Sequence, residues 1–212
     1  MDTGALVEPL SVGWHPVSQS PLKPDSSVLV LGGGPIGISC ILALRARGCG
    51  EIIVSELSSS RQKFAKHFGA THIIDPTKET SFVKKVYELT NGEGVDIVFD
   101  CAGVAAGLEA ACQSIKPRGT IVNVAIWEKA VPFQPNNLVF REGKYLACLG
   151  YVQQDFKDVI QAISSGELQE FRFKGGRGDL SHRGTLWLDA DNDRCYETTR
   201  YDHKENRSGK RG

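Results

Sequence analysis

The chain has 212 residues, 41% of them hydrophobic, and its 25 basic and 25 acidic side chains give a formal net charge of zero. This balance argues against a broad nucleic-acid interface, which needs a basic surface. The sequence shows no signal peptide and no apolar run long enough to span a bilayer, and its six cysteines form no C-x-x-C pair. We therefore expect a cytoplasmic protein with no membrane partner.

Strands and helices alternate over most of the chain. In chain order, hydrophobic periodicity and turn residues predict a strand over 27–32, a helix over 35–47, a strand over 51–56, a helix over 58–68, a strand over 71–74, a helix over 79–90, a strand over 95–101, a helix over 105–115, a strand over 120–126, a short helix over 138–142, a strand over 145–151 and a helix over 155–165. This alternation requires parallel strands joined by right-handed crossovers. The predicted fold class is α/β, a Rossmann doubly wound six-stranded parallel sheet with the strand order 3-2-1-4-5-6.

A glycine-rich turn follows the first predicted strand. Gly32, Gly34 and Gly37 fit the pattern G-x-G-x-x-G between a strand and a helix, where such a turn binds a dinucleotide. The first glycine would permit the tight turn, the second would let a pyrophosphate approach the backbone, and the third would let the helix lie close to the sheet. Pro35 falls in the first helical turn, where its missing N–H costs nothing and the free N–H groups would face the phosphates.

An acidic residue, Glu56, ends the second predicted strand about 20 residues after the last motif glycine. In a dinucleotide-binding fold, a carboxylate here hydrogen-bonds the adenosine ribose and repels a 2′-phosphate, so we predict NAD rather than NADP. The ligand should lie over the carboxyl ends of the first and fourth strands, which adds the loop Ala102-Gly103 to the site. The alternatives are a glycine turn in an unrelated α/β domain and a methyltransferase loop.

Five separated segments share their order and spacing with one protein family. They are residues 5–15, 28–37, 100–104, 123–127 and 149–151. Over residues 4–168 the chain resembles the zinc-dependent medium-chain dehydrogenases, and within them the 2,3-butanediol dehydrogenase branch, with sorbitol dehydrogenase a near relative. The resemblance implies an oxidoreductase that uses NAD and zinc.

The resemblance also implies a domain organisation. The family joins a GroES-like catalytic domain, which carries the zinc ligands, to a Rossmann domain, and most of the catalytic domain has no counterpart in this sequence. We expect residues 1–26 to form a lead-in segment and helix from the domain junction, 27–168 the NAD-binding domain, and 169–212 an atypical polar tail that is poorly ordered. The chain is then a fragment, a mis-predicted gene model or a short paralogue of such an enzyme.

The function implied by the resemblance is hydride transfer between NAD and a secondary alcohol or polyol, with zinc as the Lewis acid that polarises the alcohol oxygen. Because the main zinc ligands of the family are missing here, we expect no tight zinc site and little activity of this chain alone. The alternative hypotheses are a non-catalytic, stand-alone NAD-binding module and a truncated, inactive paralogue. We also expect a homo-oligomer, because the strand predicted over 145–151 would form an exposed edge through which two copies pair.

Further site residues follow from the resemblance. Glu8 corresponds to a carboxylate beside the catalytic zinc, which makes it the candidate catalytic residue and a weak metal ligand; its alternative role is to stabilise a helix N-terminus. Arg61 corresponds to a basic residue that flanks the adenosine, and its alternative is an exposed helix arginine. The residues implied to line the pyrophosphate and the nicotinamide are Ile36, Val124, Ala125, Ile126, Leu149, Gly150 and Tyr151.

Overall fold

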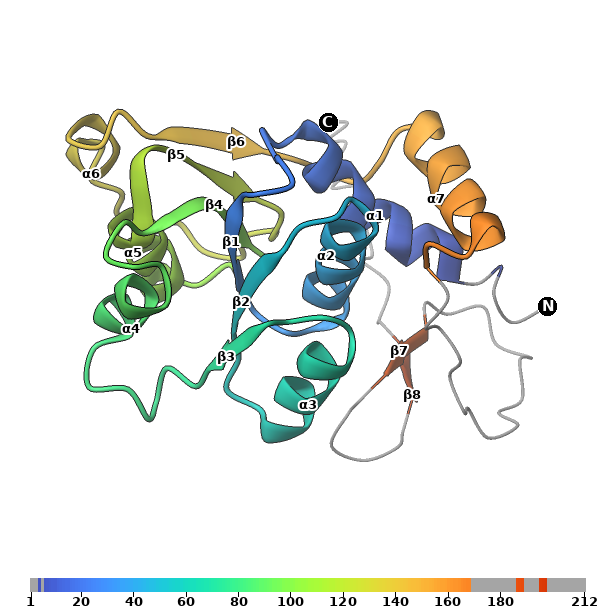
Figure 1. Ribbon diagram of the computed structural model, residues 1–212, viewed down its shortest axis with the longest axis horizontal. Coiled ribbons are helices and arrows are strands. Elements are labelled where there is room, and N and C mark those ends of the chain that lie inside the picture. Colours follow the sequence, from blue (N-terminus) through green and yellow to red (C-terminus); the bar gives the residue numbers. More distant parts are fainter. Residues whose placement is uncertain (1–3, 5, 169–185, 189–194, 198–212) are drawn as a thin grey trace, which may run out of the picture. The chain divides into compact units, whose positions relative to one another are not determined.

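The computed structural model describes residues 4, 6–168, 186–188 and 195–197 (Figure 1). Contacts within the chain divide it into two compact units, residues 1–173 and 174–212. In the second unit, β7 (Leu186–Leu188) and β8 (Cys195–Glu197) pair in the antiparallel sense. Apart from these two strands, the predicted polar tail lies outside the described residues.

Helices and strands alternate through the first unit. In chain order its elements are α1 (Val7–Gln19), β1 (Ser27–Leu31), α2 (Pro35–Ala46), β2 (Glu51–Ser55), α3 (Ser59–His67), β3 (His72–Ile74), α4 (Phe82–Leu89), β4 (Val95–Asp100), α5 (Ala105–Ser114), β5 (Ile115–Asn123), α6 (Asn136–Val139), β6 (Lys144–Ala147) and α7 (Gln153–Ser165). All six strands are parallel, in the order β3-β2-β1-β4-β5-β6. The predicted α/β class and strand order are confirmed. None of the described helices is long and apolar enough to cross a bilayer.

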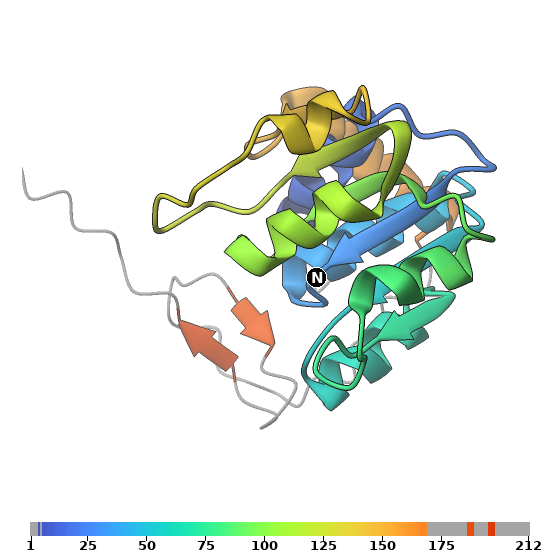
Figure 2. The ribbon, with the colours of Figure 1, turned by 90° about the vertical axis from the view of Figure 1, so that its left-hand side faces the viewer.

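Helices cover both faces of the sheet. Val28 and Val30 of β1 pack in the core cluster that includes α1, α2, α3 and α7, whereas Leu29 and Leu31 pack in the cluster that includes α4, α5 and α6. In Figure 1, α4 and α5 lie to the left of strands β1 to β3 and α2 and α3 to the right, and Figure 2 looks onto the α4 and α5 side. Because both faces are covered, β1 is an unbroken apolar run rather than an alternating one.

Helix α1 packs tightly against the Rossmann helices. A Cβ on Gly13 would lie 2.5 Å from the main-chain carbon of Ser39, so α1 approaches α2 as closely as glycine allows. At the other side, His15 Nδ1 lies 2.7 Å from Asp155 Oδ2, which joins α1 to α7. The same carboxylate accepts a 2.9 Å hydrogen bond from the Val152 N–H at the start of α7. The segment before β1 is thus tied to the first and last helices that follow the strands.

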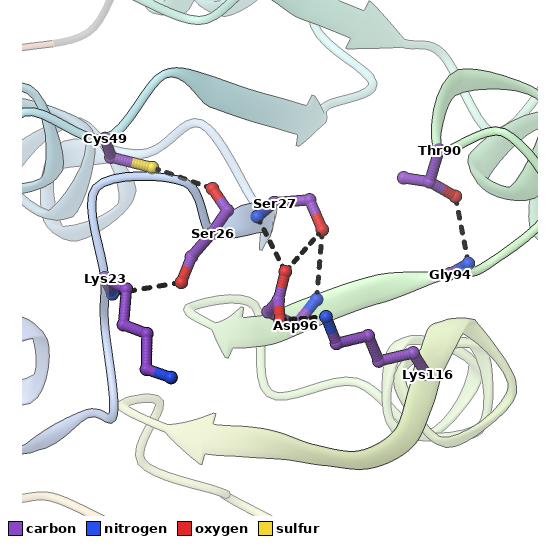
Figure 3. A network of polar contacts seen from close by, with 8 residues as sticks. All are labelled: Lys23, Ser26, Ser27, Cys49, Thr90, Gly94, Asp96 and Lys116. Atoms are coloured by element: carbon purple, nitrogen blue, oxygen red, sulfur yellow. Dashed lines mark hydrogen bonds and ion pairs between the residues drawn. The ribbon is translucent and has the colours of Figure 1, made fainter.

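A polar clamp joins three strands at the amino edge of the sheet (Figure 3). Asp96 Oδ2 in β4 accepts hydrogen bonds from the N–H and the hydroxyl of Ser27 in β1, both at 2.9 Å. Lys116 of β5 forms an ion pair with Asp96 Oδ1. Burial raises the pKa of this carboxyl, but the bonds from Lys116 and Ser27 outweigh burial and hold the pKa below its usual value.

Strand β5 begins earlier than the sequence predicts. The expected start at residue 120 is wrong, because Ile115 already pairs with Val95 and the register then shifts before Ile97 pairs with Thr120. The segment between these two pairs, which includes Pro117, is therefore an irregularity inside the strand.

Strands β5 and β6 also end earlier than predicted, at Asn123 and Ala147 instead of at residues 126 and 151. The Val124 N–H makes the last ladder bond, to the Asp100 main-chain oxygen at 2.9 Å, and the Ala125 N–H donates to the same oxygen at 2.9 Å, so the chain turns away from the ladder at Ala125. The residues predicted to line the nicotinamide consequently lie in loops beyond the strand ends.

Two helices differ from their predicted bounds for local reasons. Helix α4 begins at Phe82 rather than at residue 79, because the Ser81 hydroxyl accepts the Lys84 N–H at 3.3 Å and caps the helix there. Helix α6 is displaced from 138–142 to Asn136–Val139, and Glu142 has a φ of +49°, which is not a helical conformation.

Candidate functional site

The glycine-rich turn lies between β1 and α2, at the carboxyl edge of the sheet. Gly32 has a φ of +94°, a conformation that favours glycine, and its N–H donates to the Ser55 carbonyl at 2.8 Å. A Cβ on Gly37 would lie 2.0 Å from the Gly32 carbonyl oxygen, so a side chain here would push α2 away from the turn. A Cβ on Gly34 would meet no atom within 4 Å, so the space in front of this residue is open to a ligand.

The N-terminus of α2 is suited to an anion. Gly34 is the N-cap residue and offers no side-chain cap, Pro35 occupies the first helical position, and the first turn holds no acidic residue. The first N–H groups of a helix have no intrahelical partner and carry partial positive charge. Pro35 is exposed and Ile36 is half-buried, so both lie at the surface of this turn.

The Glu56 carboxylate is bound by main-chain N–H groups on both of its oxygens. Oε2 accepts the Gly33 N–H at 2.7 Å, and Oε1 accepts the N–H groups of Leu57 and Ser58, both at 2.8 Å. Gln62 of α3 donates from Nε2 to the Glu56 main-chain oxygen at 2.7 Å. The side chain, buried at 8% exposure, therefore links the end of β2 to the glycine turn.

The loop after β4 is shaped by Asp100. Its Oδ1 accepts the N–H groups of Ala102 and Gly103, both at 3.0 Å, while its main-chain oxygen accepts those of Val124 and Ala125. A Cβ on Gly103, whose φ is +62°, would lie 3.0 Å from the Ala125 Cβ. The loops after β4 and β5 are thus in contact, and one residue fixes both.

The loops after β5 and β6 expose apolar side chains. Ile126 and Leu149 are each 80% exposed. The Cys148 N–H donates to the Asn123 carbonyl at 3.0 Å, which places Leu149, Gly150 and Tyr151 just beyond the ends of both strands. The carboxyl ends of β5 and β6 therefore expose apolar surface at the same edge of the sheet as the turn after β1.

Most of the predicted site residues lie along this one carboxyl edge of the sheet, in the loops after β1, β2, β4, β5 and β6. Arg61 and Glu8 have no described contact with these loops. Arg61 is exposed on α3, in the turn that follows Glu56, and Glu8 is exposed in the first turn of α1. Among the described residues, no group of three or more His, Cys, Asp or Glu side chains could hold a metal ion. The described surroundings of Glu8 therefore do not fit a zinc site.

The sequence did not predict that three groups take part in this site: the Gly33 N–H, the Gln62 amide and the Asp100 carboxyl. An acid at the end of an apolar strand, followed by two small residues and a glycine, is a signal that could have identified Asp100. Nothing in the sequence marks Gly33 beyond its place in the turn.

Comparison with known proteins identifies the family of this chain. The model of the zinc-binding dehydrogenase family matches residues 35–165. An (R,R)-butanediol dehydrogenase of Saccharomyces cerevisiae is 39% identical over 174 residues, which cover 79% of this chain and 44% of the relative. The crystal structure of a 2R,3R-butanediol dehydrogenase from Bacillus subtilis, 40% identical, aligns with a TM-score of 0.73 over 77% of this chain and 46% of its own.

A zinc-binding dehydrogenase structure from Sinorhizobium meliloti 1021, bound to NADP, is 28% identical and aligns with a TM-score of 0.71 over 77% of this chain and 48% of its own. The chain thus spans about half the length of the relatives that it matches.

Proposed function

The chain belongs to the zinc-binding dehydrogenase family, and from this membership we propose that it binds NAD as the cofactor domain of an oxidoreductase. The reaction proposed is hydride transfer between NAD and a secondary alcohol or polyol. Relatives named as butanediol dehydrogenases support a vicinal diol as the first substrate to test. Residues 27–168 would form the cofactor domain, and 1–26 the segment that leads into it.

The observation that carries this proposal is the Glu56 carboxylate beside a bare glycine turn. Each carboxylate oxygen can accept about two hydrogen bonds. Oε1 already accepts two and Oε2 accepts one, from Gly33, so Oε2 keeps a position for a ribose hydroxyl. The 2′-phosphate of NADP would place a second anion next to this buried acid, and the two would repel each other. We therefore favour NAD over NADP.

The rest of the cofactor would follow the carboxyl edge of the sheet. The pyrophosphate would lie in the open space at Gly34, where the first N–H groups of α2 favour negative charge. The nicotinamide half would lie beyond β4, β5 and β6. The residues proposed to contact the cofactor are Gly32, Gly34, Pro35, Ile36, Gly37, Glu56, Arg61, Ala102, Gly103, Val124, Ala125, Ile126, Leu149, Gly150 and Tyr151.

NAD, when bound, supplies a ring that accepts a hydride. The residues of this chain would hold and orient it: the glycine turn would bind the phosphates, Glu56 would bind the adenosine ribose, and the exposed Ile126 and Leu149 would offer apolar surface to the nicotinamide half. Because the described residues around Glu8 do not fit zinc, no step is assigned to a metal here.

We also propose that two copies pair along β6. It is the outermost strand of the sheet, and Tyr145 on it is 44% exposed. An uncovered edge strand presents unpaired main-chain groups that can extend a sheet into a second molecule. Sedimentation velocity at increasing concentration tests this proposal, and a monomer throughout would contradict it.

Titration of the purified chain with NADH, followed by the fluorescence of the reduced ring, tests the proposed function. We expect saturable binding that NAD displaces and S-adenosylmethionine does not. Oxidation of 2,3-butanediol and of sorbitol is then assayed with and without added zinc. Binding without turnover would favour a non-catalytic NAD-binding module, and binding of S-adenosylmethionine in place of NADH would identify a methyltransferase instead.

A further inference from the structure

The two side-chain oxygens of Asp100, at the carboxyl edge of the sheet, differ in their hydrogen bonding. The residue is fully buried, at 0% exposure, and Oδ1 holds the N–H groups of Ala102 and Gly103. Oδ2 is also buried, but it has no hydrogen-bond partner among the described residues. An ionised carboxyl would therefore bury part of its charge against an apolar surface, at a considerable cost in free energy.

The groups around Asp100 do not supply a compensating positive charge. The charge of an ionised Asp100 acts instead on the Cys101 thiol and on the Tyr145 hydroxyl of β6, and it contributes to raising the pKa of each. On the elements packed against β4, Lys116 and Arg118 lie toward the other end of β5, and α5 carries Cys112 and the exposed Glu109. Strand β1 carries no charged residue.

The charged groups at the amino edge satisfy one another, since Asp96 and Lys116 form an ion pair. Burial raises the pKa of Asp100, and the hydrogen bonds from Gly103 and Ala102 offset only part of that increase. Burial and the unpartnered Oδ2 thus both disfavour the ionised form of this carboxyl.

We propose that Asp100 is a neutral acid in the free chain and gives up its proton when the positively charged nicotinamide ring of oxidised cofactor binds at this edge. This inference rests on the proposed function. The ring of NAD⁺ carries a positive charge that the ring of NADH lacks, and a positive charge nearby favours the ionised carboxyl. The O–H bond of the acid breaks, the proton passes to solvent, and the carboxylate remains.

The consequence is that Asp100 distinguishes the two redox states of the cofactor. Because binding and proton release are linked, NAD⁺ should bind more tightly as pH rises, by up to about tenfold per pH unit below the pKa of the carboxyl. NADH releases no proton, so its affinity should stay nearly constant over the same range. Asp100 acts here as a positioning and specificity residue, through charge rather than through contact with the reacting atoms.

The test measures proton release by the full chain in weakly buffered solution with a pH indicator. Saturation with NAD⁺ is expected to release up to one proton per chain, and saturation with NADH none. The variant Asp100→Asn keeps an oxygen for the Ala102 and Gly103 N–H groups but has no proton to lose, so the release and the pH slope should disappear. The matched control is Asp25→Asn, an exposed acid in the turn before β1, which should release the same amount as the parent chain.

Infrared difference spectra of the parent chain give a second readout that needs no variant. NAD⁺ should remove the band of a protonated carboxyl, and this holds even if Asp100→Asn fails to fold. Equal proton exchange with both cofactors, release that persists in folded Asp100→Asn, or an unchanged carboxyl band would each overturn the inference while leaving the proposed function intact. Failure of both cofactors to bind the folded chain would instead overturn the proposed function, and this inference with it.

Discussion

Oε2 of Glu56 lies 2.7 Å from the main-chain nitrogen of Gly33, so the acid proposed to hold the ribose is bound to the turn proposed to hold the pyrophosphate. The two residues follow neighbouring strands, and the parallel register that pairs Leu31 with Ser55 brings them together. A Cβ on Gly33 would lie 3.2 Å from Glu56 Oε2, so a larger residue at this position would crowd the carboxylate. The two parts of the adenosine site are therefore positioned relative to each other before a ligand arrives, which lowers the cost of binding.

Replacing Glu56 by glutamine should relax the discrimination against NADP. The neutral amide no longer repels the 2′-phosphate, so the affinity for NADPH relative to NADH should rise by about tenfold, which corresponds to about 1.4 kcal/mol. Fluorescence titration of the parent chain and of Glu56→Gln with both reduced cofactors measures this ratio. An unchanged ratio in a folded variant would count against the assignment of this acid.

Replacement by alanine at two glycines of the turn should affect different properties, stability at Gly37 and NADH binding at Gly34. Gly37→Ala places a methyl group 2.0 Å from the Gly32 oxygen, so it should lower the free energy of unfolding by about 3 kcal/mol. Gly34→Ala meets no atom of the chain and should cost less than about 1 kcal/mol, yet weaken NADH binding because the methyl group occupies the proposed pyrophosphate position. Urea unfolding and NADH titration separate the two effects. Normal NADH affinity in Gly34→Ala would place the phosphates elsewhere.

The clamp at the amino edge predicts a pH dependence of stability. The pKa of Asp96 is lower in the folded chain than the value of about 3.9 expected when unfolded, so the folded state binds fewer protons in this range. The stabilisation should be complete above that unfolded pKa and should be lost as pH falls through the folded pKa. Asp96→Asn should cost about 1–3 kcal/mol at pH 7 and progressively less in acid, as urea unfolding across pH would show. If the loss in the free energy of unfolding of Asp96→Asn did not change with pH, the stabilisation could not come from the charge of the Asp96 carboxylate.

The contact between His15 and Asp155 should contribute more to stability than an exposed pair of the same type. His15→Ala leaves a carboxylate that is 4% exposed with one fewer partner, so we expect a loss of about 1–3 kcal/mol in the free energy of unfolding. The matched control is His72→Ala, because His72 lies 3.5 Å from Glu51 with both side chains about half exposed, and such pairs contribute little. Equal losses in the free energy of unfolding of the two variants would show that burial does not strengthen the contact between α1 and α7.

A sheet covered on both faces could be predicted because apolar strands with no polar face must be buried on both sides, as Val30 and Leu31 are. The strand order could be predicted because the alternation of six strands with helices matches two mononucleotide-binding halves. The glycine turn could be predicted because the conformation at Gly32 and the clash at Gly37 are local properties of the chain. The end of β5 could not be predicted, because the chain turns where the Ala125 N–H shares the Asp100 carbonyl of a neighbouring strand with the Val124 N–H. The residue at which the strand ends therefore depends on the assembled sheet and not on the local sequence.

The role of Asp100 escaped prediction for the same reason. An acid that ends a strand is usually solvated, and only the packing of neighbouring strands and α5 reduces its exposure to 0%. Likewise, the three N–H groups around Glu56 come from two loops that the sheet brings together. Sequence patterns identified the acid and the turn, but the hydrogen bonds between them belong to the folded structure.

The turn after β1 and the acid after β2 are proposed to bind NAD together. The decisive measurement is calorimetric titration of the folded chain with NADH and with NADPH under identical conditions. We predict one site per chain for NADH and weaker binding of NADPH. Heats that show no binding of either cofactor, or equal affinity for both, would contradict the account.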